Sequence, residues 1–86
     1  MKKILLSVIL LALVVYSGCG TKGMESYDAG VNLFQEKKYN ECVVEFQNAT
    51  VENPDFSEAY MYLGRAYNSL QKYDLSIENY QKALGL

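Results

Sequence analysis

The chain repeats itself at an offset of 34 residues, and this repeat constrains its fold more than any other feature. The identical pairs at this offset are Gly30 and Gly64, Lys38 and Lys72, Tyr39 and Tyr73, Gln47 and Gln81, and Ala49 and Ala83. Further pairs are apolar in both copies and follow helical spacing, namely Leu33 and Tyr67, Val43 and Ile77, and Phe46 and Tyr80. An offset of this length is the period of a two-helix unit, so the sequence predicts stacked helical hairpins.

The second unit carries the fuller motif, which is Tyr60-x-x-Leu63-Gly64-x-x-Tyr67, then Tyr73, Ser76-x-x-x-Tyr80 and Ala83. This motif resembles a tetratricopeptide (TPR) repeat. The first unit resembles it more loosely, through Ala29-Gly30-x-x-Leu33, Tyr39, Cys42-x-x-x-Phe46, Ala49 and an inter-repeat Pro54, with Ser26 in place of the opening aromatic. The resemblance implies an all-α fold of two tandem helix-turn-helix hairpins, a short right-handed α-solenoid, with repeats at about 24–56 and 57–86.

Four helices are expected, at roughly Met24–Glu36, Asn40–Glu52, Ser57–Leu70 and Asp74–Leu84. Asn40, Asp74 and Ser57 are expected to cap the helices that they open, because their side chains can accept a backbone N–H bond. Gly30 and Gly64 lie in helix interiors, where glycine is unfavourable, so a close helix approach is the expected compensation. The facing residues are then expected to be small, which assigns Cys42 and Ser76 to these contacts.

A short apolar run precedes the repeats. Met1-Lys2-Lys3 is followed by 13 apolar-rich residues, Ile4 to Tyr16, and then by Ser17-Gly18-Cys19. This order is typical of a secretion signal, and the run is shorter than the ~20 residues that span a bilayer as a helix. The segment from Val15 to Cys19 resembles the bacterial lipobox, which implies cleavage before Cys19 and lipidation of that residue. Tyr16 departs from the usual aliphatic residue, and an ordinary signal peptide with an incidental cysteine, or an uncleaved anchor, are the alternatives.

The expected organisation is therefore a lipoprotein signal peptide at 1–18, a lipidated Cys19 with a short tether at 19–23, and two TPR repeats at 24–86. The lipid would hold the chain on the extracytoplasmic face of a bacterial cell membrane or outer membrane. The residue after Cys19 is Gly20 rather than the aspartate that retains some lipoproteins at the inner membrane. This favours the outer membrane. The stack would be truncated or uncapped, with Leu75, Tyr80, Leu84 and Leu86 as an apolar end face.

Charge and residue counts exclude several functions. Removal of Lys2 and Lys3 with the signal leaves six basic and ten acidic side chains, a net charge of −4 that disfavours nucleic-acid binding. The chain has no histidine, which removes Ser-His and Cys-His nucleophiles and histidine-containing metal sites. Cys42 is interpreted as a buried thiol, with an intermolecular disulfide as the alternative. We find no sequence basis for an enzyme, a cofactor or a metal.

The function that the sequence still supports is recognition of a protein or peptide partner. In TPR proteins the first helices of successive units line a concave groove, so the resemblance assigns groove positions to Tyr27, Val31, Phe34, Met61, Arg65 and Asn68. Tyr27, Val31 and Tyr62 stand where a carboxylate clamp would need lysine and asparagine, which disfavours capture of a peptide C-terminus. An extended or helical segment laid along the groove fits better.

The sequence is compatible with two classes of function. The first is a membrane-anchored adaptor that scaffolds an envelope complex, as TPR lipoproteins do in outer-membrane protein assembly or type IV pilus assembly. The second is a structural module for self-association, or a fragment of a longer TPR protein. Partners of unlike sequence would favour the first, and self-association without another partner would favour the second.

Overall fold

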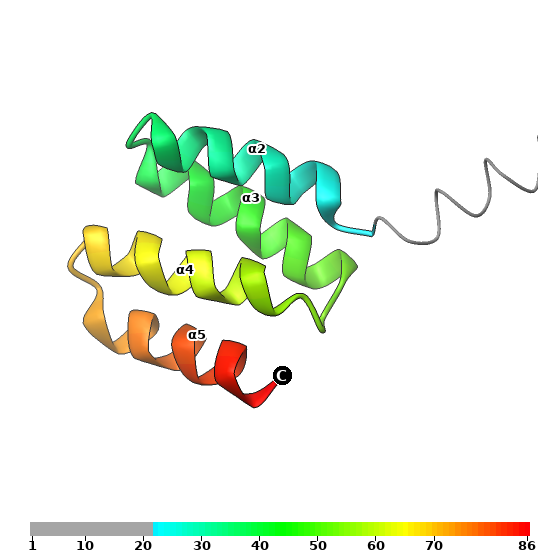
Figure 1. Cartoon of the computed structure of the whole chain (residues 1–86). Coiled ribbons are helices and arrows are strands. Elements are labelled where there is room, and N and C mark those ends of the chain that lie inside the picture. Colours follow the sequence, from blue (N-terminus) through cyan, green and yellow to red (C-terminus); the bar gives the residue numbers. More distant parts are fainter. Residues whose placement is uncertain (1–21) are drawn as a thin grey trace, which may run out of the picture.

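The computed structural model describes residues 22–86, which form four helices joined by short turns (Figure 1). The helices are α2 (Met24–Gln35), α3 (Tyr39–Glu52), α4 (Ser57–Ser69) and α5 (Tyr73–Gly85). Each predicted helix is present, with every end within one residue of its expected position. Residues 22–86 contain no strand, so the all-α class is confirmed for them. The predicted signal peptide, Cys19 and most of the tether lie outside the described residues.

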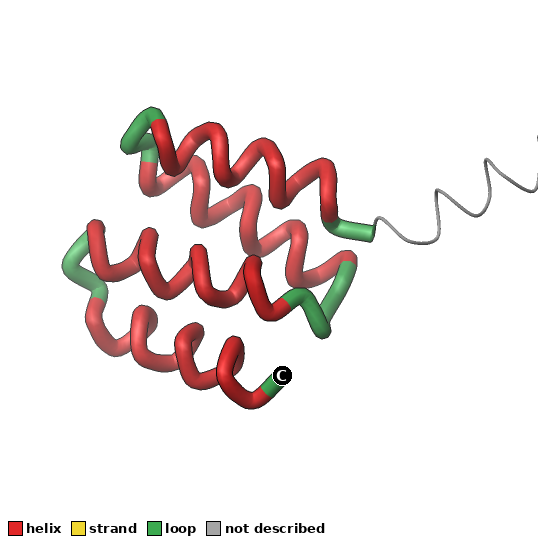
Figure 2. Tube along the Cα trace, viewed as in Figure 1, coloured by secondary structure: helices red, strands yellow, loops and turns green. Residues whose placement is uncertain are grey.

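The helices form two hairpins, α2 with α3 and α4 with α5, that stack on each other (Figure 2). The helix α3 packs against both α2 and α4, and α4 packs against both α3 and α5. Within residues 22–86, α5 contacts no helix other than α4. None of these helices is long and apolar enough to span a membrane.

The core lies where the hairpins meet, on α3 and α4. Its buried apolar residues are Cys42, Val43, Phe46, Leu63, Ala66 and Tyr67. By contrast, the buried residues of α5 are the polar Ser76 and Asn79. The repeat therefore places most of its apolar burial in the two central helices.

Both hairpins turn through the same backbone geometry. In the first, Lys37 has a positive φ of 62°, and the N–H groups of Lys37 and Lys38 donate to the carbonyls of Phe34 and Leu33 at 3.0 and 2.9 Å. In the second, Gln71 has the same φ of 62°, and equivalent bonds run from Gln71 and Lys72 to Asn68 and Tyr67. This pair of bonds is a Schellman motif, which satisfies the last carbonyls of α2 and α4.

The predicted side-chain caps are wrong. The N-cap positions of α3, α4 and α5 belong to Lys38, Phe56 and Lys72, and no side-chain cap bond is formed at any of them. Lys38 and Lys72 end the Schellman motif and open the next helix at once, so no position remains between the helices for a capping residue. Asn40 and Asp74 consequently lie inside their helices, while Ser57 is the first residue of α4 and follows Phe56 at the N-cap.

The close approach at the glycines is present, but an aromatic ring makes it. A Cβ atom on Gly30 would lie 2.8 Å from the ring of Phe46, and one on Gly64 would lie 2.8 Å from the ring of Tyr80. The expectation of a small facing residue is therefore wrong for this contact, because the missing side chain makes room for a ring rather than for Cys42 or Ser76. Ser76 does reach the same turn, where its hydroxyl donates to the Gly64 carbonyl at 2.7 Å.

Gly23, directly before α2, is held against the first hairpin. Gly23 is buried with a φ of 81°, and its N–H donates to a carboxylate oxygen of Glu52 at 3.2 Å. The Ser26 hydroxyl donates to the other oxygen of the same carboxylate at 3.4 Å. The chain therefore enters the hairpins at a defined point beside the end of α3.

Candidate partner-binding face

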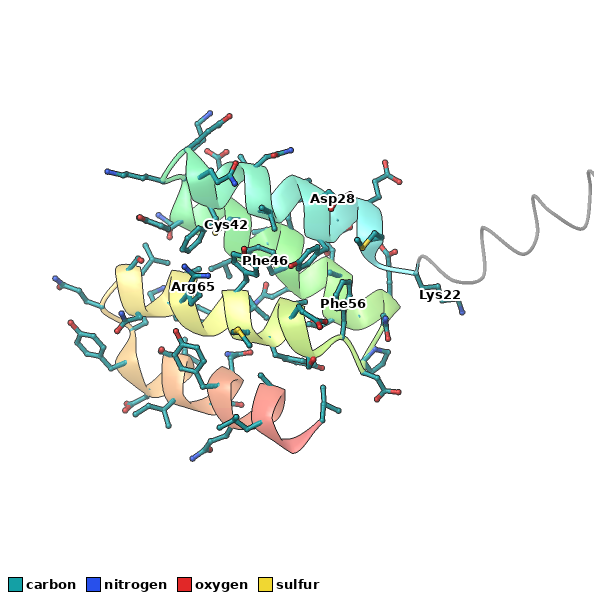
Figure 3. The ribbon with its side chains drawn as sticks, in the orientation of Figure 1. Lys22, Asp28, Cys42, Phe46, Phe56 and Arg65 are labelled. Atoms are coloured by element: carbon teal, nitrogen blue, oxygen red, sulfur yellow. The ribbon has the colours of Figure 1, made fainter. Side chains whose placement is uncertain are left out.

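An aromatic row lies between α2 and α4, made of Tyr27, Tyr62 and Phe34. The Tyr62 ring on α4 meets Tyr27 and Phe34 of α2 edge to face, at centroid distances of 5.7 and 5.5 Å. It also stacks on the buried Phe46 at 5.1 Å. These distances lie in the range where aromatic pairs stabilise each other beyond the area that they bury. The row therefore joins the two hairpins. Figure 3 labels three residues that contact the row, namely Phe46, Phe56 and Arg65.

Tyr27 forms one end of the row. Its ring stacks on Phe56 at 4.7 Å and meets Phe46 at 5.8 Å. Burial raises the pKa of the Tyr27 phenol above its ordinary value, and the nearby Tyr62, Glu58 and Asp28 raise that pKa further. The phenol is thus neutral at physiological pH, and the surroundings of this end carry carboxylates.

Arg65 forms the opposite end, and its charge is held on the aromatic row. The guanidinium carbon lies 5.2 Å from the ring centroid of Phe34 and 5.1 Å from that of Tyr62. The two ion pairs found within residues 22–86 join Lys38 with Glu36 and Lys82 with Glu78, so neither engages Arg65. Cation–π contacts orient a guanidinium without using its N–H donors. Arg65 is therefore both positioned and able to bind an acidic group.

The structure brings three of the six predicted groove residues into one contact set, namely Tyr27, Phe34 and Arg65. Val31 is half-buried and packs against the core. Met61 and Asn68 are exposed on α4, and helical spacing places them one turn before and one turn after Arg65. Both residues therefore lie on the same side of α4 as Arg65 and are open to solvent, but they are not part of the aromatic row.

Sequence reasoning missed Tyr62 and Phe56 as members of this face. The signal for Tyr62 was its position three residues before Arg65, which places both side chains on one side of the helix. The resemblance instead identified Tyr62 only as a residue that does not fit the carboxylate clamp of some TPR proteins. Phe56 lies in the connection before α4, where helical periodicity gives no guidance.

The residues of the repeat motif occupy mainly structural positions. Most are buried, including Gly30, Cys42, Phe46, Ala49, Leu63, Gly64, Tyr67 and Ser76. Tyr39, Tyr60, Tyr80 and Ala83 are half-buried, while Pro54 and Tyr73 are exposed. Tyr39 packs on Phe34, whereas the residue equivalent to Phe34 in the second hairpin is Asn68, which leaves Tyr73 without that ring.

Cys42 is fully buried, and its thiol donates to the Tyr39 carbonyl at 3.2 Å. Burial raises the pKa of this thiol, which keeps it protonated and weakens it as a nucleophile. Its expected role as a buried thiol agrees with this environment. Among residues 22–86, no group of three or more acidic, cysteine or histidine side chains is placed to hold a metal ion.

Comparison with known proteins adds no identification. No family model matches the chain, and no curated protein matches it.

Proposed function

We propose that the protein is a lipid-anchored adaptor of the TPR type, which binds a protein partner at the extracytoplasmic face of a bacterial membrane. Support for the repeat class comes from the 34-residue period and from two stacked hairpins with the same turn geometry. Support for the anchor comes from the Ser17-Gly18-Cys19 sequence after a short apolar run.

The aromatic row with Arg65 at its end carries the binding proposal. Tyrosine and arginine are enriched among the residues that contribute most to protein interfaces, and this face presents both in fixed positions. The guanidinium is pre-oriented by two rings, so a partner carboxylate would gain charge-assisted hydrogen bonds with little ordering of the arginine. The partner segment would place an acidic residue at Arg65 and apolar side chains along the row toward Met61.

Site-specific photocrosslinking in cells tests this surface. A photoreactive amino acid at Met61 or at Asn68 should give an adduct of the same partner, because both positions flank Arg65 on α4. Asn48, which is exposed on α3, is the matched control and should give no such adduct. Arg65→Glu should abolish the adduct and Arg65→Lys should weaken it. Equal adducts from Asn48, or adducts indifferent to Arg65→Glu, would refute this face as the binding surface.

The membrane anchor has a separate test. Intact mass of the membrane-extracted protein should show a chain that begins at a lipid-modified Cys19, and Cys19→Ser should remove the protein from the membrane or leave its precursor uncut. Cys42→Ser is the control and should leave the modification unchanged, because Cys42 is buried in the hairpin stack. A mature chain without lipid on Cys19 would exclude the lipoprotein assignment.

A further inference from the structure

The two ends of the aromatic row carry opposite charges. At one end the Arg65 guanidinium lies over two rings of the row. At the other end the pKa of the Tyr27 phenol is raised by burial and, beyond that, by its neighbours Tyr62, Glu58 and Asp28. The two carboxylates therefore lie within electrostatic reach of the Tyr27 end. Figure 3 shows Asp28 and Arg65 toward opposite ends of the helices.

The separation of the charges follows from their positions on α4. Glu58, Tyr62 and Arg65 follow one another at intervals of four and three residues, so they lie along one side of the helix. Seven residues of an α-helix rise by roughly 10 Å, which separates the acidic position from the basic one. Tyr62 and the exposed Met61 lie between them. A ligand that reaches both charges must cross the aromatic row.

The three charged side chains are open to a ligand. Asp28, Glu58 and Arg65 are exposed, and none of them belongs to either ion pair found within residues 22–86. Lys22, which precedes α2, also belongs to neither pair. Glu58 and Arg65 are two helical turns apart, so they do not neutralise each other directly. A ligand with complementary charges would be attracted at both ends, whereas like charges at either end would be repelled.

We propose that this face selects a peptide segment with a basic and an acidic residue on either side of an apolar centre, matched to charges roughly 10 Å apart. The segment is the partner of the adaptor proposed above, so this step rests on that function and specifies its ligand. The acidic residue binds Arg65, the apolar side chains cover Tyr62, and the basic residue lies near Asp28 and Glu58. A uniformly acidic segment, which Arg65 alone would accept, is repelled at the Tyr27 end.

An extended segment has the dimensions to do this. Residues four apart in an extended chain are separated by about 13 Å and point to the same side, as does the residue midway between them. The long side chains of lysine and glutamate can bend to cover the difference from the spacing on α4. Lysine and glutamate four residues apart, with an aromatic residue midway, therefore make the simplest matching ligand.

Four labelled peptides with blocked ends test this charge pattern. They share a leucine-tyrosine-leucine centre and differ only in the two flanking residues, which are lysine and glutamate, two glutamates, two lysines or two glutamines. Each is titrated with the full chain extracted in non-ionic detergent, and fluorescence anisotropy reports binding. The lysine–glutamate peptide should bind at least fivefold more tightly than each of the other three.

Charge reversals in the protein should change the preferred peptide. Arg65→Glu should make the two-lysine peptide the tightest ligand, and Asp28→Lys combined with Glu58→Lys should make the two-glutamate peptide the tightest. These residues are exposed, so the variants should fold, which circular dichroism checks. Glu41→Lys combined with Asp74→Lys changes the net charge as much as the second variant does, at exposed positions of α3 and α5. This matched control should leave the order of affinities unchanged.

The proposal is overturned if the two-glutamate peptide binds the unaltered protein as tightly as the lysine–glutamate peptide, or if none of the four peptides binds. It is also overturned if the matched control shifts the preference as the Asp28 and Glu58 variant does, because net charge would then explain the result. The photocrosslinking experiment described above separates this failure from failure of the proposed function. Adducts that still depend on Arg65 would keep the face as the binding surface while its charge preference is rejected.

Discussion

The two hairpins share one local design but differ in how deeply the same positions are buried. Their turns have matching hydrogen bonds and the same positive φ of 62°, and each glycine lies under an aromatic ring. Phe46 is fully buried, however, while its equivalent Tyr80 is only half-buried. The difference arises because α3 has a helix on each side and α5 contacts α4 alone within residues 22–86. Local sequence thus determines the hairpin, and neighbouring hairpins determine which residues are core.

The hairpins also differ in the chemistry of their second helices. The buried residues of α3 are apolar or weakly polar, whereas Ser76 and Asn79 of α5 each donate a hydrogen bond, to the carbonyls of Gly64 and Leu75. The Ser76 bond crosses to α4, whereas the Asn79 bond stays within α5. A helix with one covered side buries little apolar area, so the single bond from Ser76 contributes a larger share of its contact with α4. The second hairpin is accordingly expected to tolerate changes of volume better than changes of polarity.

Substitution of the two glycines should produce the largest difference between the hairpins. Gly30→Leu forces a side chain into the ring of Phe46, which is fully buried and cannot move aside. We expect a loss of about 3 kcal/mol in the free energy of unfolding for Gly30→Leu, and about 1 kcal/mol for Gly64→Leu, because the half-buried Tyr80 can turn toward solvent. Urea denaturation of the segment 20–86, followed by circular dichroism, measures both. Equal losses would contradict the difference in freedom between the two rings.

Truncation of the equivalent aliphatic residues should give the next largest difference. Val43→Ala removes two methyl groups from the covered face of α3 and should destabilise the protein by about 1 to 2 kcal/mol. Ile77→Ala removes more atoms but from an exposed position, so its effect should stay within about 0.5 kcal/mol. The same denaturation experiment measures both. A loss for Ile77→Ala as large as that for Val43→Ala would mean that another molecule already covers α5 in the sample.

Exchange of Cys42 and Ser76 tests the difference in polarity. Ser76→Cys replaces the hydroxyl that donates to the Gly64 carbonyl at 2.7 Å and should cost about 1 kcal/mol. Cys42→Ser should be nearly neutral, because the new hydroxyl can donate to the Tyr39 carbonyl, to which the Cys42 thiol already donates at 3.2 Å. Thermal melts of the two variants give the comparison. A neutral Ser76→Cys would mean that the hydrogen bond contributes nothing to the second hairpin.

The sequence was sufficient to predict the four helices and their limits because glycine, aromatic and small residues recur at fixed helical spacing. It failed at the caps, because a Schellman motif that runs directly into the next helix leaves nothing for Asn40 or Asp74 to cap. It also failed to name Tyr80 and Phe46 as the groups that cover the glycines, since side-chain direction across a helix pair does not follow from spacing alone.

The candidate face was predicted in part. Arg65 and Phe34 were assigned from the resemblance, and the structure adds the contact between them and the central position of Tyr62. Such contacts depend on the offset between α2 and α4, which no motif within a single repeat encodes. The identity of a partner is likewise absent from the sequence, because binding surfaces of stacked hairpins vary independently of the residues that build the stack.

The smallest expected effect is a gain in stability from glycine in the turns, and it should be the same in both hairpins. Lys37 and Gln71 both adopt a left-handed conformation, which is unfavourable for residues with a Cβ atom and is normally occupied by glycine at the end of a Schellman motif. Lys37→Gly and Gln71→Gly should each stabilise the protein by about 0.5 kcal/mol, since the relief of strain exceeds the entropy that glycine adds to the unfolded chain. Lys37→Ala and Gln71→Ala are the controls, and they should give no gain because alanine keeps the Cβ atom. Urea denaturation measures both gains. Unequal gains from the two glycine variants would show that the position of a hairpin in the stack also affects the backbone strain in its turn.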